Sequence, residues 1–101
     1  MDIGLSEQEK EKLCRCFSSI LPLRRVMLFG SRAVGNFRKS SDVDLALEGA
    51  ELKMEDIFEL EKALEELRLS YRFDLVALRQ VSNEKLKEHI RRAGVCLWVR
   101  E

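Results

Sequence analysis

Short apolar runs alternate with longer amphipathic segments along this chain, and that alternation most constrains its fold. The apolar runs have the length of buried strands and cover residues 25–29, 44–47, 72–78 and 95–99. The amphipathic segments carry apolar residues three and four positions apart, as helices do, and cover residues 6–19, 54–69 and 83–93. The order helix, strand, strand, helix, strand, helix, strand predicts an α/β or α+β fold. We expect a small mixed β-sheet with helices covering one face.

Local signals support the boundaries of these elements. Ser6-Glu7-Gln8-Glu9 is a capping box that predicts the start of the first helix, and Pro22 marks the boundary after it. Residues 30–41 are rich in glycine, serine and arginine, which predicts a loop with one helical turn. Because the 101 residues contain no repeat or linker, we expect one domain over residues 1–101.

Composition and charge narrow the class of protein. No apolar run approaches the roughly 18 residues that span a bilayer, and no basic and apolar leader opens the chain. Three cysteines form no closed disulfide framework, so we expect a cytoplasmic protein without a membrane contact. The net charge is zero and the pI is about 6.6, which disfavours a general nucleic-acid surface.

The charges are nevertheless segregated along the chain. Residues 12–39 contain seven basic residues and no acidic one, whereas residues 42–66 contain ten acidic and two basic residues. Such segments are often solvated faces of opposite sign. A basic wall beside an acidic cluster also suits a polyphosphate that carries a divalent metal.

Three aspartates lie in or beside predicted strands. Asp42 and Asp44 alternate with Val43, so both should project from one face of a strand. Paired carboxylates repel one another unless a cation lies between them, and Mg²⁺ prefers such oxygen ligands. Aspartate is also common where a strand begins. Asp74 interrupts the apolar strand 72–78; either Arg72 or Arg79 forms a salt bridge with it, or it completes a two-metal site with the first two carboxylates.

A glycine-rich turn follows the first predicted strand directly. Gly30 and Ser31 begin the segment Gly-Ser-Arg-Ala-Val-Gly, where backbone N–H groups and a hydroxyl could hold a phosphate. The alternative is a plain tight turn. A Walker A loop is excluded because Asn36 and Phe37 occupy the positions that require lysine and serine or threonine.

Taken together, these features resemble the polymerase-β-like nucleotidyltransferase superfamily, whose signature is Gly-Ser followed ten residues later by Asp-x-Asp. Residues 32–41 are those ten residues, and Asp74 stands on a later strand. The resemblance is in particular to the minimal, stand-alone members called MNT domains. It covers nearly the whole chain, including the helix around residues 86–90 and the apolar strand after it.

The resemblance implies a role for each of these positions. Gly30 and Ser31 would hold the triphosphate of ATP or another NTP, and Asp42 and Asp44 would bind Mg²⁺ in a two-metal site. Asp74 would complete the metal-binding triad and help to activate the attacking hydroxyl as a base. Many relatives carry arginine at the position of Val34, and Arg32 is either a substitute phosphate contact or a solvated loop residue.

The resemblance also implies a reaction and a partner. The expected reaction is transfer of a nucleotidyl group, AMP in the first instance, to an acceptor hydroxyl. Larger relatives add a helical domain that helps to bind the substrate, and nothing follows residue 101, so we expect a partner or a second copy to supply that surface. Similar MNT proteins are antitoxins that pair with helical HEPN proteins, and in some pairs they adenylylate a tyrosine of the toxin.

Two other functions stay open at this point. The first is a non-enzymatic antitoxin that neutralises its partner by masking it, and the second is transfer onto a small molecule. The only histidine, His89, lies at a helical position where a surface or satisfied core residue is more usual than a ligand.

Overall fold

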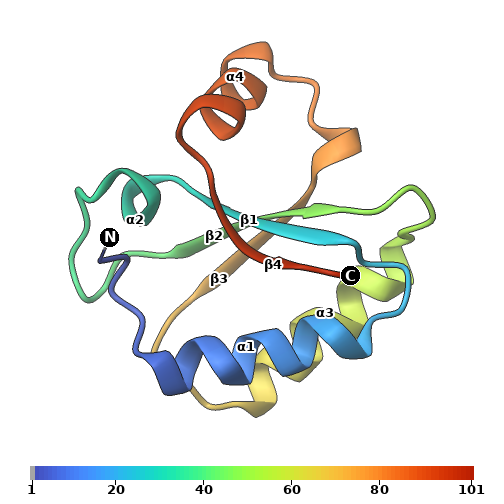
Figure 1. Cartoon of the computed structure of the whole chain (residues 1–101), viewed down its shortest axis with the longest axis horizontal. Helices are drawn as coiled ribbons and strands as arrows, with labels where there is room; N and C mark the ends of the chain where they lie inside the picture. The colour runs from blue at the N-terminus through green and yellow to red at the C-terminus, as the bar shows by residue number, and fades with distance from the viewer. Residues whose placement is uncertain (1) are drawn as a thin grey trace.

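The chain folds into three layers, with a four-stranded mixed sheet between helices on both of its faces (Figure 1). The computed structural model describes residues 2–101. The strand order is β3-β2-β1-β4; β2 and β3 are parallel, and the other two pairs are antiparallel. In chain order the elements are α1 (Glu7–Ser19), β1 (Arg25–Phe29), α2 (Ser31–Val34), β2 (Val43–Glu48), α3 (Met54–Glu66), β3 (Phe73–Ala77), η1 (Leu78–Gln80), α4 (Glu84–Ala93) and β4 (Val95–Val99).

Side-chain caps explain where two of the helices begin. The Ser6 hydroxyl accepts from the Glu9 N–H at 3.0 Å, and the Glu9 carboxylate accepts from the Ser6 N–H at 2.9 Å. These reciprocal bonds are the predicted capping box of α1. The Asn83 side chain accepts from the N–H groups of Lys85 and Leu86 and so caps α4.

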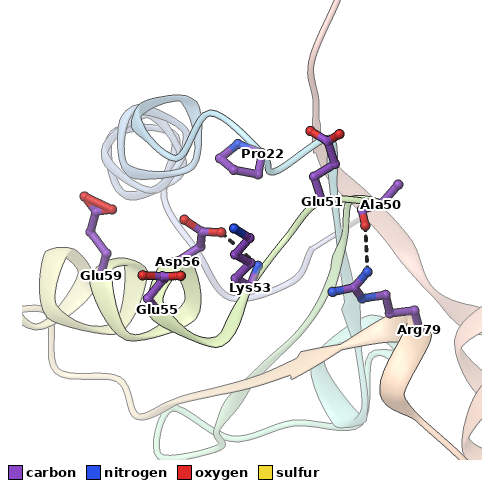
Figure 2. Close-up of a pocket in the computed structure, with 8 residues that line it drawn as sticks. All are labelled: Pro22, Ala50, Glu51, Lys53, Glu55, Asp56, Glu59 and Arg79. Carbon is purple, nitrogen blue, oxygen red and sulfur yellow. Dashed lines mark hydrogen bonds between the residues drawn. The ribbon is translucent and has the colours of Figure 1, made fainter.

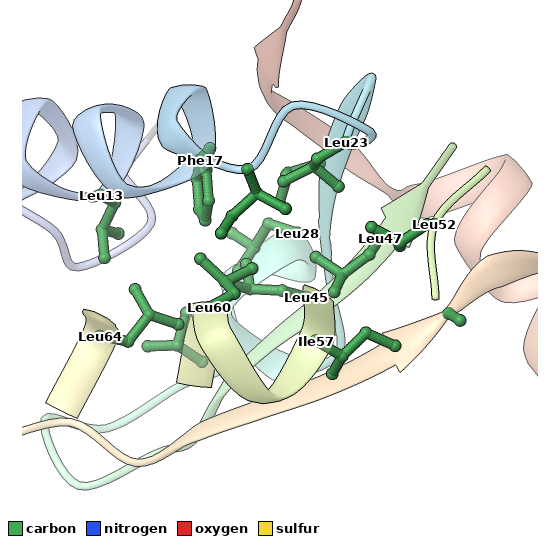
Figure 3. Close-up of a cluster of buried hydrophobic side chains, with 14 of the residues drawn as sticks. Leu13, Phe17, Leu23, Leu28, Leu45, Leu47, Leu52, Ile57, Leu60 and Leu64 are labelled. Atoms are coloured by element: carbon green, nitrogen blue, oxygen red, sulfur yellow. The ribbon is translucent and has the colours of Figure 1, made fainter. Parts of the chain in front are cut away.

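The main hydrophobic core lies between the sheet and the pair α1 and α3 (Figure 3). Alternate residues of the two central strands point into it, among them Val26 and Leu28 of β1 and Leu45 of β2. The helices contribute residues at helical spacing, including Leu13, Phe17, Leu60 and Leu64, which Figure 3 shows meeting the strand side chains. Burial on this scale is the main term that stabilises so small a fold.

A second, smaller core lies on the opposite face, where α4 covers the sheet. It consists of Phe29, Ala46 and Ile90, with Met27 and Leu86 packed against them. The prediction that helices cover one face was therefore wrong. The reason is visible in β1: both of its faces carry apolar side chains, and a strand of this kind needs cover on each side.

The remaining elements follow the predictions closely. The strands begin and end within one residue of the predicted limits, whereas α3 ends at Glu66, three residues early. The short helix η1 was not predicted. No helix among residues 2–101 is long and apolar enough to cross a bilayer.

Candidate functional site

The three aspartates lie where β2 and β3 begin, on the face of the sheet that α4 covers. Asp44 and Asp74 are paired across the parallel strands β2 and β3. Asp42 precedes β2 by one residue, and the side chains of Val43 and Leu45 are fully buried on the other face. Because side chains alternate along a strand, the three carboxylates share one face of the sheet.

Within residues 2–101, the three carboxylates have no ion-pair partner. Among residues 2–101, no ion pair and no side-chain hydrogen bond involves Asp42, Asp44 or Asp74. The sequence left open a salt bridge between Asp74 and Arg79, but the structure does not contain it. Arg79 donates to the carbonyls of Ala50 and Leu52 instead. The carboxylate oxygens of the cluster are therefore not engaged by another described side chain and can accept an incoming cation.

The electrostatics of Asp44 reflect this crowding. Burial raises the pKa of the Asp44 carboxyl above its ordinary value of 3.8, the charges of Asp74 and Asp42 raise that pKa further, and His89 acts in the opposite direction. Because an opposite charge favours the ionised form of a carboxyl, a cation bound beside Asp44 would relieve this effect.

The carboxylates are neighbours, but they do not form a closed cage. In residues 2–101, no group of three or more His, Cys, Asp or Glu side chains is arranged to hold a metal ion. Mg²⁺ is commonly bound by one or two carboxylates together with substrate phosphates and water. Asp42 and Asp44, with Asp74 across the strand pair, fit that open kind of site.

The Gly-Ser turn lies directly against Asp44. Gly30 has φ +77° and ψ −156°, and a Cβ at this position would lie 2.3 Å from Asp44 Oδ2. Any other residue would therefore clash with the carboxylate and strain the backbone. The Gly30 carbonyl accepts from the N–H groups of Ala33 and Val34 and so starts α2.

The N–H groups of Ser31 and Arg32 occupy the first two positions of α2, where no intrahelical acceptor exists. Both groups are thus available beside the carboxylates. This is the arrangement expected of a phosphate cradle, although phosphate binding itself stays a prediction.

The side chain of Arg32 has neither of the roles that the sequence left open, a phosphate contact or a solvated loop residue. It is the one charged side chain that is buried among residues 2–101, with 1% of its surface exposed. Its guanidinium lies over the rings of Phe37 and Tyr71, at 5.1 Å and 4.9 Å from their centroids. Its N–H groups donate to the carbonyls of Ile3, Gly4, Arg38, Lys39 and Ser41.

The Arg32 side chain therefore holds three segments together and does not reach a ligand. The segments are the N-terminal residues 3–4, the loop 38–41 that leads into β2, and α2 itself. Prediction from the sequence missed this role because the five carbonyls come together only in the folded chain.

Val34, the position where many relatives carry arginine, is 54% exposed at the end of α2. Gly35 follows it as a left-handed C-cap with φ +82°. With the Arg32 side chain turned inward, α2 presents no cationic side chain to the carboxylates.

His89 is the site residue that sequence reasoning missed. Its Nε2 accepts from the Gly30 N–H at 3.0 Å, across 59 residues of sequence. The ring also meets Phe29 edge to face, with centroids 6.4 Å apart. No local pattern signals this contact, because it exists only where α4 packs on β1.

A surface depression lies at another place on the molecule (Figure 2). It is lined by Glu51, Lys53, Glu55 and Arg79 among others, beyond the far ends of β2 and β3. Neither the three aspartates nor the Gly-Ser turn contributes to it. The carboxylate cluster is therefore distinct from this depression.

Comparison with known proteins agrees with this geometry. Residues 11–101 match the family described as "Polymerase beta, Nucleotidyltransferase". No curated protein sequence matches the chain.

Solved structures give the same result for the fold. The chain is 31% identical to a protein described as a minimal nucleotidyltransferase, with a TM-score of 0.73 over 94% of this chain and 95% of that one. It is 26% identical to a chain of a toxin–antitoxin structure with AMP-PNP, with a TM-score of 0.72 over 91% and 74% of the two chains.

A third similar structure is a tri-AMPylated Shewanella oneidensis HEPN toxin in complex with an MNT antitoxin. The identity is 26% and the TM-score 0.65, over 90% of this chain and 70% of that one. The mixed sheet with helices on both faces is thus the polymerase-β-like fold that the sequence resemblance implied.

Proposed function

The chain belongs to the polymerase β nucleotidyltransferase family, and we propose that it transfers a nucleotidyl group from a nucleoside triphosphate to an acceptor hydroxyl. The observation that carries this proposal is the meeting of three unpaired carboxylates with a glycine-rich turn. Gly30 approaches Asp44 so closely that no side chain fits between them, and Asp44 is paired in register with Asp74.

Each part of the site has a chemical task in this proposal. The N–H groups of Ser31 and Arg32 and the Ser31 hydroxyl bind phosphate oxygens. Asp42 and Asp44 would hold Mg²⁺, which would neutralise charge that develops on the transferred group and on the departing pyrophosphate. Asp74 lies on the neighbouring strand and accepts the proton of the attacking hydroxyl. Positioning supplies most of the rate, since no covalent step on the protein is needed.

We further propose that the acceptor is a hydroxyl of a helical HEPN-type partner and that this chain is the antitoxin. Two observations support this. Asp42 and Asp74 are exposed and Asp44 is half-buried, so another molecule can reach the carboxylate cluster. Similar structures are toxin–antitoxin complexes, one with AMP-PNP and one with an AMPylated HEPN toxin.

The test is label transfer from α-labelled ATP with Mg²⁺ in the presence of the partner protein encoded beside this chain. Asp44→Asn and Asp74→Asn should abolish transfer, because each removes a carboxylate of the cluster. Glu61→Gln, an exposed carboxylate of α3, is the matched control and should transfer at the wild-type rate. Absence of labelled partner with the wild-type chain, under conditions where the two proteins form a complex, would rule out the enzymatic proposal.

A second candidate function is neutralisation of the partner by masking alone. It is favoured by one observation: α2 presents no cationic side chain to a triphosphate, because Val34 replaces the usual arginine and the Arg32 side chain is buried. Calorimetric titration of wild type and Asp44→Asn with ATP and Mg²⁺ separates the two candidates. Equal, negligible ATP binding by both proteins, with partner binding intact in both, would establish masking.

A further inference from the structure

The imidazole of His89 is fixed by two contacts that meet at the end of β1. Nε2 accepts from the Gly30 N–H at 3.0 Å, and the ring packs edge to face on Phe29 at 76°. The next residue, Ile90, is buried with Phe29 and anchors α4 on the sheet. A ring nitrogen that accepts a hydrogen bond does so through its lone pair, so this contact depends on the Nε2 lone pair of His89.

The Gly30 N–H needs such a partner. β1 ends at Phe29, so the N–H of Gly30 lies beyond the last strand residue and just before α2. A glycine at this place has many alternative conformations, and the observed one, with φ +77°, brings the backbone against Asp44. A hydrogen bond from an outside element removes part of that freedom.

A second consequence concerns Asp44. Its Oδ2 lies on the side of Gly30 where a Cβ would be. An unpaired N–H beside a carboxylate readily forms a charge-assisted hydrogen bond. With the N–H directed to His89, the Asp44 oxygens keep their lone pairs for a cation.

We propose that His89 is a positioning residue, which holds the Gly30-Ser31 turn through the Nε2 lone pair in the conformation that binds the triphosphate. It acts through the backbone of Gly30 and does not touch the nucleotide. The step from the turn to the triphosphate rests on the proposed function above; the hydrogen bond itself does not.

Three substitutions separate the acceptor from simple packing. His89→Gln places a side-chain oxygen near the position of Nε2, whereas His89→Phe keeps a flat ring beside Phe29 but has no acceptor. Leu86→Ala is the structural control, since Leu86 packs in the same small core of α4 but its side chain has no hydrogen-bond acceptor for the Gly30 N–H. Chemical denaturation verifies that each variant folds, and His89→Leu replaces His89→Phe if the latter does not.

Two readouts are needed. The first is hydrogen exchange of the Gly30 amide, followed by NMR relative to the central amides of β1. The second is the dependence of nucleotidyl transfer on NTP concentration. In His89→Phe, we expect Gly30 to exchange about tenfold faster and the KM for NTP to rise about tenfold, which corresponds to roughly 1.4 kcal/mol. The kcat of His89→Phe should change less than threefold. His89→Gln should stay within about threefold of wild type in both readouts. Leu86→Ala should lose stability, but neither the exchange of Gly30 relative to β1 nor the KM should change.

Three outcomes would overturn the inference: a Gly30 amide that stays protected in His89→Phe, a His89→Gln variant as impaired as His89→Phe, or the same KM change in Leu86→Ala. A wild-type chain that transfers no nucleotide contradicts the proposed function instead. In that case the exchange of the Gly30 amide still decides whether His89 holds the turn.

Discussion

Replacement of Arg32 by methionine should lower the free energy of unfolding by about 3–4 kcal/mol, because it leaves buried carbonyls without a donor. Methionine has similar length and apolar character, so it fills the space between Phe37 and Tyr71. It cannot donate to the carbonyls that the guanidinium now satisfies. These belong to Ile3, Gly4, Arg38, Lys39 and Ser41.

The magnitude follows from the contacts of the guanidinium. Hydrogen bonds to a charged group contribute about 1.5–3 kcal/mol each. Six of them would add up to roughly 9–18 kcal/mol, which exceeds the total of about 5–15 kcal/mol for a whole domain. The net contribution of Arg32 is therefore smaller than this sum, because the cost of desolvating the buried cation offsets much of it. The better guide is the cost of about 1–3 kcal/mol for each buried acceptor that loses its donor, so two carbonyls left without a donor account for about 3–4 kcal/mol.

Urea denaturation followed by circular dichroism measures this change. Arg32→Lys keeps the charge but lacks the planar fork, so it should recover only about half of the loss. Arg15→Met, an exposed arginine of α1, is the matched control and should stay within about 0.5 kcal/mol of wild type. A loss below about 1 kcal/mol for Arg32→Met, or full recovery by lysine, would refute the clamp role, because fewer than two of the charged hydrogen bonds would then be contributing.

Three further predictions concern the site. Asp44→Asn should reduce nucleotidyl transfer at least about 100-fold in the label-transfer assay, because stabilisation by a metal ion is worth several kcal/mol and each 1.36 kcal/mol is tenfold. The pKa of Asp44 is raised by burial and by its two carboxylate neighbours, so the folded chain binds this proton more tightly than the unfolded chain does. Without metal, the stability of the fold should therefore fall as pH rises through the range just above 3.8. Thermal unfolding in EDTA measures this slope, which should be shallower in Asp44→Asn. An unchanged slope would contradict the raised pKa of Asp44. Val34→Arg should lower the KM for NTP about threefold to fivefold, since an exposed charge pair contributes at most ~1 kcal/mol. The unfolding midpoint should not change, because Val34 is exposed. A KM that does not fall would show that the triphosphate lies away from the end of α2.

The sequence predicted those features that depend on neighbours along the chain. The capping box at Ser6, the strands and the alternation of Val43 with the flanking aspartates are of this kind, and the structure agrees with them. The side of the sheet that α4 covers depends on tertiary packing, and its few apolar residues, such as Ile90, do not specify a face by themselves. In the sequence, nothing distinguishes Arg32 from an ordinary loop arginine. Its carbonyl partners lie up to 29 residues away and come together around it only when the chain folds.

Roles within the site divide in the same way. Gly30 and the paired aspartates were recognisable from their ten-residue spacing, whereas the contact of His89 with Gly30 joins residues 59 positions apart. A lone histidine in an amphipathic helix has no periodicity that distinguishes an acceptor of this kind from a surface residue. Side chains that support a site from another element are the part that sequence patterns omit.

Because β3 lies at the edge of the sheet, Asp74 is held less rigidly than Asp44. β2, which carries Asp44, has hydrogen-bonded strands on both sides, whereas β3, which carries Asp74, has one on a single side. Edge strands open more readily than central ones. The distance between Asp44 and Asp74 should therefore vary more than any other distance within the site. A molecule that paired with the free edge of β3 would restrict this variation without touching either carboxylate.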